Sequence, residues 1–299
     1  MKSNFKAHLF ILSANIIYGI NYSVGKVVLR SIPAFGIVFI RVSVALIIFW
    51  LIHQIFIKEK VERKDQAKLF LASLFGVAIN QLLFFKGLSL TSEIHSALIM
   101  ITTPLIVLLM AWIILKDKIT LPKAAGIIIG GIGVALLISS GSKDAASPSN
   151  SLGDIFIMIN ATSYAIFLII AKPLMKKYSP LTIAKWIFIY GFFLVLPFGI
   201  NDFLTINWAD LSTDTILALI FVVFGATVLA YLFNMLGLNF GSPALVSVYI
   251  YTQPVIATLI AVFSGSDRIS IEKIISSLLV FAGVALVSFT GARTKGKKI

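Results

Sequence analysis

A stripe of polar and aromatic residues runs along the first apolar stretch of the chain. It consists of Asn15, Tyr18, Tyr22 and Lys26, whose spacings of three, four and four residues place them on one face of a helix. Amides and phenols can hydrogen-bond a polar solute, phenol rings can pack against its apolar part, and an ammonium can attract an anion. The stripe therefore predicts a cavity wall. The alternative is hydrogen bonding between packed membrane helices, which uses the same residue types.

Two later stretches carry similar stripes. Asn160 and Tyr164 are four residues apart, and Thr227, Tyr231 and Asn234 follow at spacings of four and three. We interpret these faces as further walls of one cavity. The candidate substrate-binding residues are Asn15, Tyr18, Asn21, Tyr22, Lys26, Arg41, Asn80, Phe84, Thr102, Thr103, Asn160, Tyr164, Tyr231, Asn234, Tyr249 and Gln253.

Arg41 is the one charged residue well inside an apolar stretch. A charge near the centre of a bilayer costs at least ~2.5–3.5 kcal/mol unless it is solvated or paired. We expect Arg41 to anchor a substrate carboxylate or to form a gate contact with Glu93, near the outer end of the fourth predicted helix. Lys26 is a second candidate partner for an anion. The alternative is snorkelling, because Arg41 lies about eight residues, or ~12 Å, from the nearer end of its helix.

Two prolines occupy the middle of predicted helices. Pro104 and Pro254 each remove a backbone donor and free a carbonyl one turn earlier, at Met100 and Ile250. A kink is expected in both helices, and freed carbonyls near mid-membrane offer polar contacts to a substrate. We therefore predict Pro104 and Pro254 as hinges, against the alternative of static packing kinks.

The composition determines which elements position these residues. The chain has 299 residues, of which 59% are apolar and 12% charged, with a mean hydropathy of +1.02. Soluble domains are roughly 45–50% apolar and about 25% charged. A water-soluble fold is excluded, and the sequence predicts an integral membrane protein. Cysteine is absent, which excludes a disulfide framework and thiolate metal sites.

Ten stretches are long enough to cross a membrane, since a helix needs about 20 apolar residues to span ~30 Å of hydrocarbon. They cover residues 7–28, 33–55, 66–85, 91–115, 121–140, 153–173, 179–199, 214–236, 243–263 and 271–290. The loops between them are short and leave no room for a soluble catalytic domain. The predicted fold is an all-α membrane protein with ten transmembrane helices.

The loop charges orient this bundle. With a cytoplasmic N-terminus, eighteen Lys and Arg residues fall on the inner side and six on the outer side. Because cytoplasmic loops are enriched in Lys and Arg, both termini are expected to be cytoplasmic. The net charge of +13 is then a property of the loops, and we expect no nucleic-acid partner.

The chain also contains an internal repeat. Residues 87–141 align with residues 237–291 without a gap, with sixteen of 55 positions identical, and an offset of 146 pairs Tyr18 with Tyr164 and Lys26 with Lys172. We predict a first repeat at 7–140, a linker at 141–152 and a second repeat at 153–292. Because each repeat holds five helices, an odd number, the second must be inverted. Inverted repeats are typical of alternating access, with the substrate site near the midplane.

The sequence lacks the motifs that several other activities require. The chain has no HExxH, no GxxxxGK[ST] and no pair of intramembrane carboxylates, so an enzyme is not expected. The absence of an intramembrane carboxylate favours facilitated transport, or coupling through a group other than a carboxylate. Gly126, Gly130 and Gly131 follow a small-xxx-small pattern, which predicts close helix packing within the repeat or in a dimer.

Taken together, these residues resemble the EamA family of the drug/metabolite transporter superfamily. The resemblance rests on residues 18–26 (YGINYSVGK), Arg41, Thr103-Pro104, Gln253-Pro254, and the acidic residues Asp117 and Asp267. Tyr18 and Asp117 stand where the family usually has Trp and Glu. The resemblance implies a ten-helix inverted-repeat carrier of the cytoplasmic membrane that commonly exports amino acids or other metabolites.

The sequence thus predicts a secondary transporter that exports amino acids or similar small metabolites by alternating access through a central cavity. The alternatives are an exporter of drugs or other metabolites and, from a different class, a channel or a membrane-embedded enzyme. The expected partners are a small-molecule substrate and the lipid bilayer, with no cofactor, no metal and a monomer as the assembly.

Overall fold

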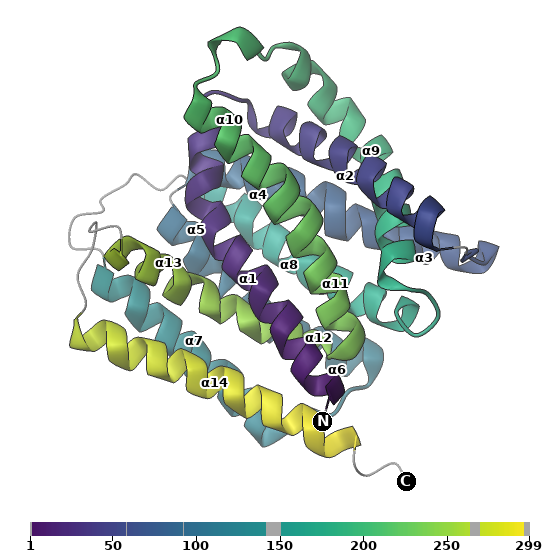
Figure 1. Cartoon of the computed structure of the whole chain (residues 1–299). Coiled ribbons are helices and arrows are strands. Elements are labelled where there is room, and N and C mark those ends of the chain that lie inside the picture. Colours follow the sequence, from purple (N-terminus) through teal and green to yellow (C-terminus); the bar gives the residue numbers. More distant parts are fainter. Residues whose placement is uncertain (1, 58, 92, 142–150, 264–269, 296–299) are drawn as a thin grey trace.

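The computed structural model describes residues 2–57, 59–91, 93–141, 151–263 and 270–295. Within those ranges every regular element is a helix, and the helices pack into one bundle (Figure 1). The predicted linker at 141–152 lies mostly outside the described residues, and so does Asp267.

Helical rods follow one another along the chain in the order that the apolar stretches predict. The first half contains α1 (Lys2–Leu29), α2 (Ala34–Phe56), a rod made of α3 (Arg63–Ser73), η1 (Leu74–Ala78) and α4 (Ile79–Leu90), then α5 (Glu93–Met100), α6 (Thr103–Leu115) and α7 (Leu121–Gly141).

The second half repeats this order. It contains α8 (Ser151–Leu174), α9 (Pro180–Leu204), the short η2 (Trp208–Asp210), a rod made of α10 (Thr213–Ile220), η3 (Phe221–Leu229) and α11 (Ala230–Phe240), then α12 (Pro243–Val248), η4 (Tyr249–Tyr251), α13 (Thr252–Phe263) and α14 (Ile271–Lys295).

Five helical rods of the described chain are long and apolar enough to cross a membrane: Ala34–Phe56, Arg63–Leu90, Ser151–Leu174, Pro180–Leu204 and Thr213–Phe240. Shorter apolar helices occur at Thr103–Leu115, Leu121–Leu136 and Ile274–Ser288. The first helix, α1, is 28 residues long but carries Asn15, Tyr18, Asn21 and Tyr22, which lower its hydropathy.

The fourth and ninth predicted spans are interrupted just before their prolines. The fourth, predicted as continuous over 91–115, is two helices with a turn at Ile101 and Thr102, and Pro104 is the second residue of α6. In the ninth, a 3₁₀ turn at Tyr249–Tyr251 precedes α13, in which Pro254 is the third residue. A proline is tolerated in the first turn of a helix, where its missing N–H has no intrahelical acceptor. Thr91, predicted to begin the fourth span, instead ends α4.

π-helical segments interrupt the third and eighth rods at equivalent positions. They are η1 in the first half and η3 in the second. Such segments widen the helix locally, leave its hydrogen bonding less regular, and occur frequently at functional sites.

Equivalent helices of the two halves run antiparallel. Gly126 of α7 packs against Gly283 of α14, while Gly133, further along α7, packs against Ser276 and Leu279, which lie earlier in α14. The two helices lie side by side in Figure 1. The glycine motif therefore packs against the other half of the same chain. The expectation that it packs within its own repeat is wrong.

The helices α2 and α9 form the second antiparallel pair, and each receives a carboxylate at its N-terminus. Asp202, near the end of α9, accepts a hydrogen bond of 3.2 Å from the backbone N–H of Phe35 in α2. Glu59, which follows α2, accepts one of 2.9 Å from the N–H of Ser179, the N-cap of α9. A negative group is favoured at a helix N-terminus, where backbone donors lack intrahelical acceptors.

Helices α1, α4, α8 and α11 surround the middle of the bundle as two mixed pairs. Gly237 of α11 lets Ile11 of α1 approach closely, and Gly87 of α4 does the same for Ile157 of α8. Each pair joins one helix from either half, so the space between the pairs is bounded by both halves.

Candidate functional site

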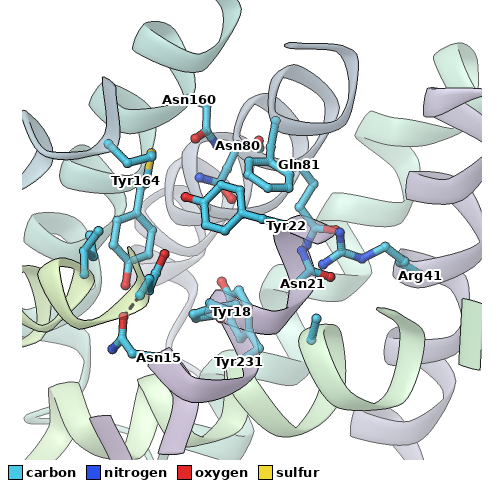
Figure 2. Close-up of a pocket in the computed structure, with 16 residues that line it drawn as sticks. Asn15, Tyr18, Asn21, Tyr22, Arg41, Asn80, Gln81, Asn160, Tyr164 and Tyr231 are labelled. Atoms are coloured by element: carbon cyan, nitrogen blue, oxygen red, sulfur yellow. Dashed lines mark hydrogen bonds between the residues drawn. The ribbon is translucent and has the colours of Figure 1, made fainter. Parts of the chain in front are cut away.

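A cavity lies in the middle of the bundle, between the two halves (Figure 2). The space in it that is open to the centre of a water molecule is about 100 Å³. It is lined by Asn15, Tyr18, Asn21, Tyr22, Arg41, Gly76, Asn80, Gln81, Phe84, Met100, Asn160, Tyr164, Ala226, Tyr231, Ile250 and Gln253.

The lining reflects the repeat. Tyr18 and Tyr164 are related by the offset of 146, and the offset of 150 relates Gly76 to Ala226, Gln81 to Tyr231 and Met100 to Ile250. Four pairs of equivalent positions therefore face one space. Gly76 and Ala226 come from the π-helical segments η1 and η3, and Met100 directly precedes the break between α5 and α6.

Most of the predicted site residues meet at this cavity. Eleven of the sixteen line it, namely Asn15, Tyr18, Asn21, Tyr22, Arg41, Asn80, Phe84, Asn160, Tyr164, Tyr231 and Gln253. Helical spacing identified the residues of α1 and α8, because one face of each of these helices lines the cavity.

Five predicted residues lie elsewhere. Lys26, expected to attract an anion, donates instead to the carbonyl oxygen of Thr91 at 2.8 Å, at the C-terminus of α4. Lys172, its equivalent, donates to the carbonyl oxygen of Gly241 at 2.6 Å, at the C-terminus of α11. The two lysines occupy the same place in the two halves. The reason is local: the last carbonyls of a helix lack donors and attract a cation.

The other four have hydrogen-bond or contact partners of their own. The amide of Asn234 donates to the hydroxyl of Tyr164 at 2.8 Å. The hydroxyl of Tyr249 lies 2.7 Å from Nδ1 of His8. Thr102 donates to the carbonyl oxygen of Ile99, and Thr103 contacts the sulfur of Met100. These residues therefore contribute to helix packing around the helix breaks and the cavity walls.

Three lining residues were missed by the sequence analysis: Gly76, Gln81 and Ala226. Met100 and Ile250 were expected near the site only through the backbone carbonyls freed by the prolines. Gln81 carried a usable signal, since it is a polar residue inside an apolar stretch and directly follows Asn80. The small residues Gly76 and Ala226 carried none, because nothing in their type separates a cavity wall from helix packing.

Arg41 is the only charged residue among those that line the cavity. Its side chain is 5% exposed, its Nε donates to Oγ1 of Thr227 at 2.6 Å, and its guanidinium carbon lies 4.7 Å from the ring centre of Phe85. Among the side chains that the structure describes, which do not include that of Glu93, no carboxylate pairs with Arg41. The cavity therefore has one positively charged wall, with Asn21 on the same side, and Tyr164 and Asn15 face it from the opposite side (Figure 2).

Amide side chains hold the walls together. Gln253 donates to Oδ1 of Asn15 at 2.7 Å, and Asn160 donates to the backbone carbonyl oxygen of Asn80 at 2.7 Å. Both bonds join one half of the chain to the other. They fix the outline of the cavity across the boundary between the halves.

Four buried polar atoms of the lining have no hydrogen-bond partner in the described structure. They are the amide oxygens of Asn21, Gln81 and Asn160 and the hydroxyl of Tyr231. Buried polar atoms are nearly always satisfied, so a cluster of unsatisfied ones at one cavity calls for a bound solute or water. Three of the four can only accept, and a group bearing hydrogen-bond donors suits them.

Aromatic rings complete the walls. Tyr22 packs edge-on against Phe84 with ring centres 5.6 Å apart, and Tyr231 does so against Phe188 at 5.0 Å. Tyr18 and Tyr164 are partly exposed to the cavity. The site thus offers one cation, several hydrogen-bonding groups and apolar faces, but the lining contains no carboxylate, thiol or histidine. The described residues also contain no cluster of possible metal ligands. The arrangement is suited to reversible binding of an amphipathic solute.

The chain is similar over most of its length to several known proteins. An uncharacterized transporter of Archaeoglobus fulgidus is 22% identical over 290 residues, which cover 95% of this chain and 98% of the relative. The uncharacterized transporter YyaM of Bacillus subtilis is 28% identical and covers 78% of the chain and 76% of its own length. Protein PecM of Dickeya dadantii is 26% identical over 73% and 72%.

A solved crystal structure has the same fold. It superposes with a TM-score of 0.75, covers 96% of this chain and 98% of its own, and is 16% identical in sequence. The EamA-like transporter family matches residues 5–139 and again residues 151–289. The chain therefore belongs to the EamA-like transporter family, carries two EamA domains, and is a multi-pass membrane transporter rather than an enzyme.

Proposed function

We propose that the chain is a secondary transporter with ten transmembrane helices in two inverted repeats, which exports amino acids or similar small metabolites by alternating access. The substrate binds in the central cavity between the halves. Both termini lie in the cytoplasm, and the protein acts in the cytoplasmic membrane.

The observation that carries the substrate class is the chemistry of the cavity. Arg41 supplies a single buried cation without a carboxylate partner among the described residues. A substrate carboxylate would neutralise it, because a buried charge is stable only when it is paired. The unsatisfied amide oxygens would accept bonds from an ammonium group, and Tyr18, Tyr22 and Tyr164 would pack against an apolar side chain. An α-amino acid carries all three features.

Alternating access is supported by the arrangement of the halves. Equivalent helices run antiparallel, as α7 and α14 do, which is the relation expected of inverted repeats. The breaks before Pro104 and Pro254 lie in equivalent helices next to Met100 and Ile250 of the cavity. Broken helices at such positions are typical of carriers, and we assign Pro104 and Pro254 to hinges on this ground.

Other substrates in the same superfamily fit the cavity less well. A nucleotide-linked or otherwise multiply charged substrate would need more cations than Arg41, now that Lys26 is engaged at the end of α4. A neutral drug would leave Arg41 unpaired. A channel would not need a site closed by residues of both halves. The lining has no carboxylate to carry a proton, so we propose transport down the substrate gradient.

Counterflow in proteoliposomes tests the proposal. Vesicles loaded with an unlabelled L-amino acid should accumulate the same labelled amino acid transiently, whereas a channel would only equilibrate it. Arg41→Gln should abolish the exchange. Arg30→Gln, which changes an exposed arginine at the end of the first helix, should leave it intact. Absence of exchange for every L-amino acid, with the protein folded and correctly inserted, would refute the amino-acid assignment.

A further inference from the structure

The guanidinium of Arg41 is held on two sides by fully buried residues. Thr227 accepts the hydrogen bond from Nε at 2.6 Å, and the ring of Phe85 lies 4.7 Å from the guanidinium carbon. Phe85 and Thr227 are both 0% exposed. Since Nε is occupied and one face is covered, the two terminal nitrogens are the part of the group left for a ligand.

The hydroxyl of Thr227 has a fixed hydrogen-bonding direction. It donates to the carbonyl oxygen of Val222, five residues earlier, at 2.8 Å, within the π-helical segment η3. A hydroxyl has one hydrogen, so its oxygen can only accept from a second partner, and a guanidinium can only donate. Because its hydrogen is used within this π-helical turn, the hydroxyl oxygen of Thr227 acts as the acceptor for Nε of Arg41.

The equivalent position in the first half has no side-chain hydroxyl. Val77, related to Thr227 by the offset of 150, lies in η1 and packs against Gly191. The π-helical turn therefore forms without a hydroxyl at this position. A role in forming its own π-helical turn does not account for the hydroxyl of Thr227, because the equivalent turn forms with Val77. The hydroxyl occurs in the half whose π-helical segment contacts Arg41.

We propose that Thr227 is a positioning residue, which holds Arg41 so that its two terminal nitrogens present a paired donor to the substrate carboxylate. Two parallel N–H···O bonds from one guanidinium to one carboxylate give both affinity and geometric selectivity. Thr227 thereby sets the preference of the site for carboxylates over neutral analogues. This inference rests on the proposed function, because it assumes that the substrate carries a carboxylate.

The test compares L-leucine, L-phenylalanine and L-threonine with their carboxamides as ligands of the purified protein. Thr227→Val keeps the shape of the side chain and removes the hydroxyl. It should weaken binding of the acids about tenfold and change binding of the amides less than about twofold. Thr227→Ser should restore the preference for the acids. Thr258→Val, which removes a hydroxyl bonded only to its own helix at Pro254, should leave both affinities unchanged.

The outcomes separate the two proposals. If the wild type prefers acids and Thr227→Val keeps that preference, or weakens acids and amides equally, the positioning role is refuted and the proposed function stands. If the wild type binds the amides as well as the acids, the carboxylate site itself is refuted, and the role of Thr227 with it. Should Thr227→Val melt at a much lower temperature, Thr227→Ala gives the same comparison, because it also removes the hydroxyl and puts no methyl group in the place of Oγ1.

Discussion

The hydroxyl of Tyr251 donates to the carbonyl oxygen of Ile101 at 3.2 Å, and these two residues occupy the same position in the two halves of the chain, 150 residues apart. If the two halves are related by a two-fold axis, as proposed above, residues that touch their own repeat equivalents must lie close to that axis. The breaks in the fourth and ninth rods therefore meet at that axis, beside the cavity.

The packing of Tyr251 gives a first prediction. A Cβ added at Gly130 would come within 2.6 Å of Cδ2 of Tyr251, whereas one at Gly131 would find its nearest neighbour at 3.4 Å. Gly130→Ala should lower the free energy of unfolding by about 1–3 kcal/mol through overpacking. Gly131→Ala is the matched control and should change it little. Thermal melting in detergent measures both, and equal melting temperatures would contradict the assigned contact.

The lysines Lys26 and Lys172 give a second prediction. Each donates to carbonyl oxygens at a helix C-terminus, so Lys26→Met and Lys172→Met should each lower stability by about 1.5–3 kcal/mol. Substrate affinity should remain unchanged. Lys176→Met, at an exposed position, is the control. If Lys26→Met keeps normal stability but loses much of its substrate affinity, the structural role is contradicted and Lys26 is an anion-binding residue.

Much of the fold follows from the sequence, because apolar length and the repeat register are properties of the chain itself. The stripe of Tyr18 and Tyr22 was readable for the same reason. The hydrogen bond of Lys26 could not be predicted from the sequence, because it depends on the tertiary position of the C-terminus of α4. Tyr249 and Asn234 have the right residue types, but their hydroxyl and amide are taken up by partners from other helices, His8 and Tyr164.

A third prediction concerns the polar cluster that joins α3 to the loop between α8 and α9. The carboxylate of Asp65, 2% exposed, accepts hydrogen bonds from Lys177 at 2.8 Å and Tyr178 at 2.9 Å. Asp65→Asn should lower the melting temperature, because it removes the charge that accepts both hydrogen bonds. Glu62→Gln, which breaks an exposed ion pair with Lys64, should change stability by less than about 1 kcal/mol. Equal effects would contradict the role given to burial.

The pH dependence of the same cluster follows from its charges. The hydrogen bond to Asp65 raises the pKa of Lys177. A raised lysine pKa contributes stability that is fully present below the unfolded value of about 10.4 and is lost as the pH rises through the folded value. The stability difference between wild type and Lys177→Met should therefore be constant from about pH 6 to about pH 8 and shrink only in strongly alkaline solution.

The fourth prediction separates binding from packing at the paired tyrosines. Tyr18→Ala and Tyr164→Ala should each weaken amino-acid binding about tenfold or more, because they remove an aromatic face from the cavity. Tyr164→Phe should also lower stability, since it leaves the amide of Asn234 without its acceptor. Isothermal titration and melting on the same preparations decide the matter: unchanged affinity with lowered melting would assign both tyrosines to packing.

A fifth prediction tests the orientation. The chain has no cysteine, so single cysteines can be introduced at the exposed positions Lys60 and Ala209. In intact cells, Ala209→Cys should react with an impermeant maleimide, whereas Lys60→Cys should react only after lysis. The reverse pattern would place both termini outside.

The placement of Thr227 and Val77 has a kinetic consequence. In the proposed carrier, two similar halves would let the bundle adopt two shapes related by the pseudo-two-fold axis. The charged wall belongs to one side of the cavity only, so those shapes would differ in energy and in substrate affinity. An uncoupled carrier of this kind must show the same ratio of maximal rate to half-saturation concentration in both directions. The half-saturation concentrations themselves will differ between the two faces of the membrane.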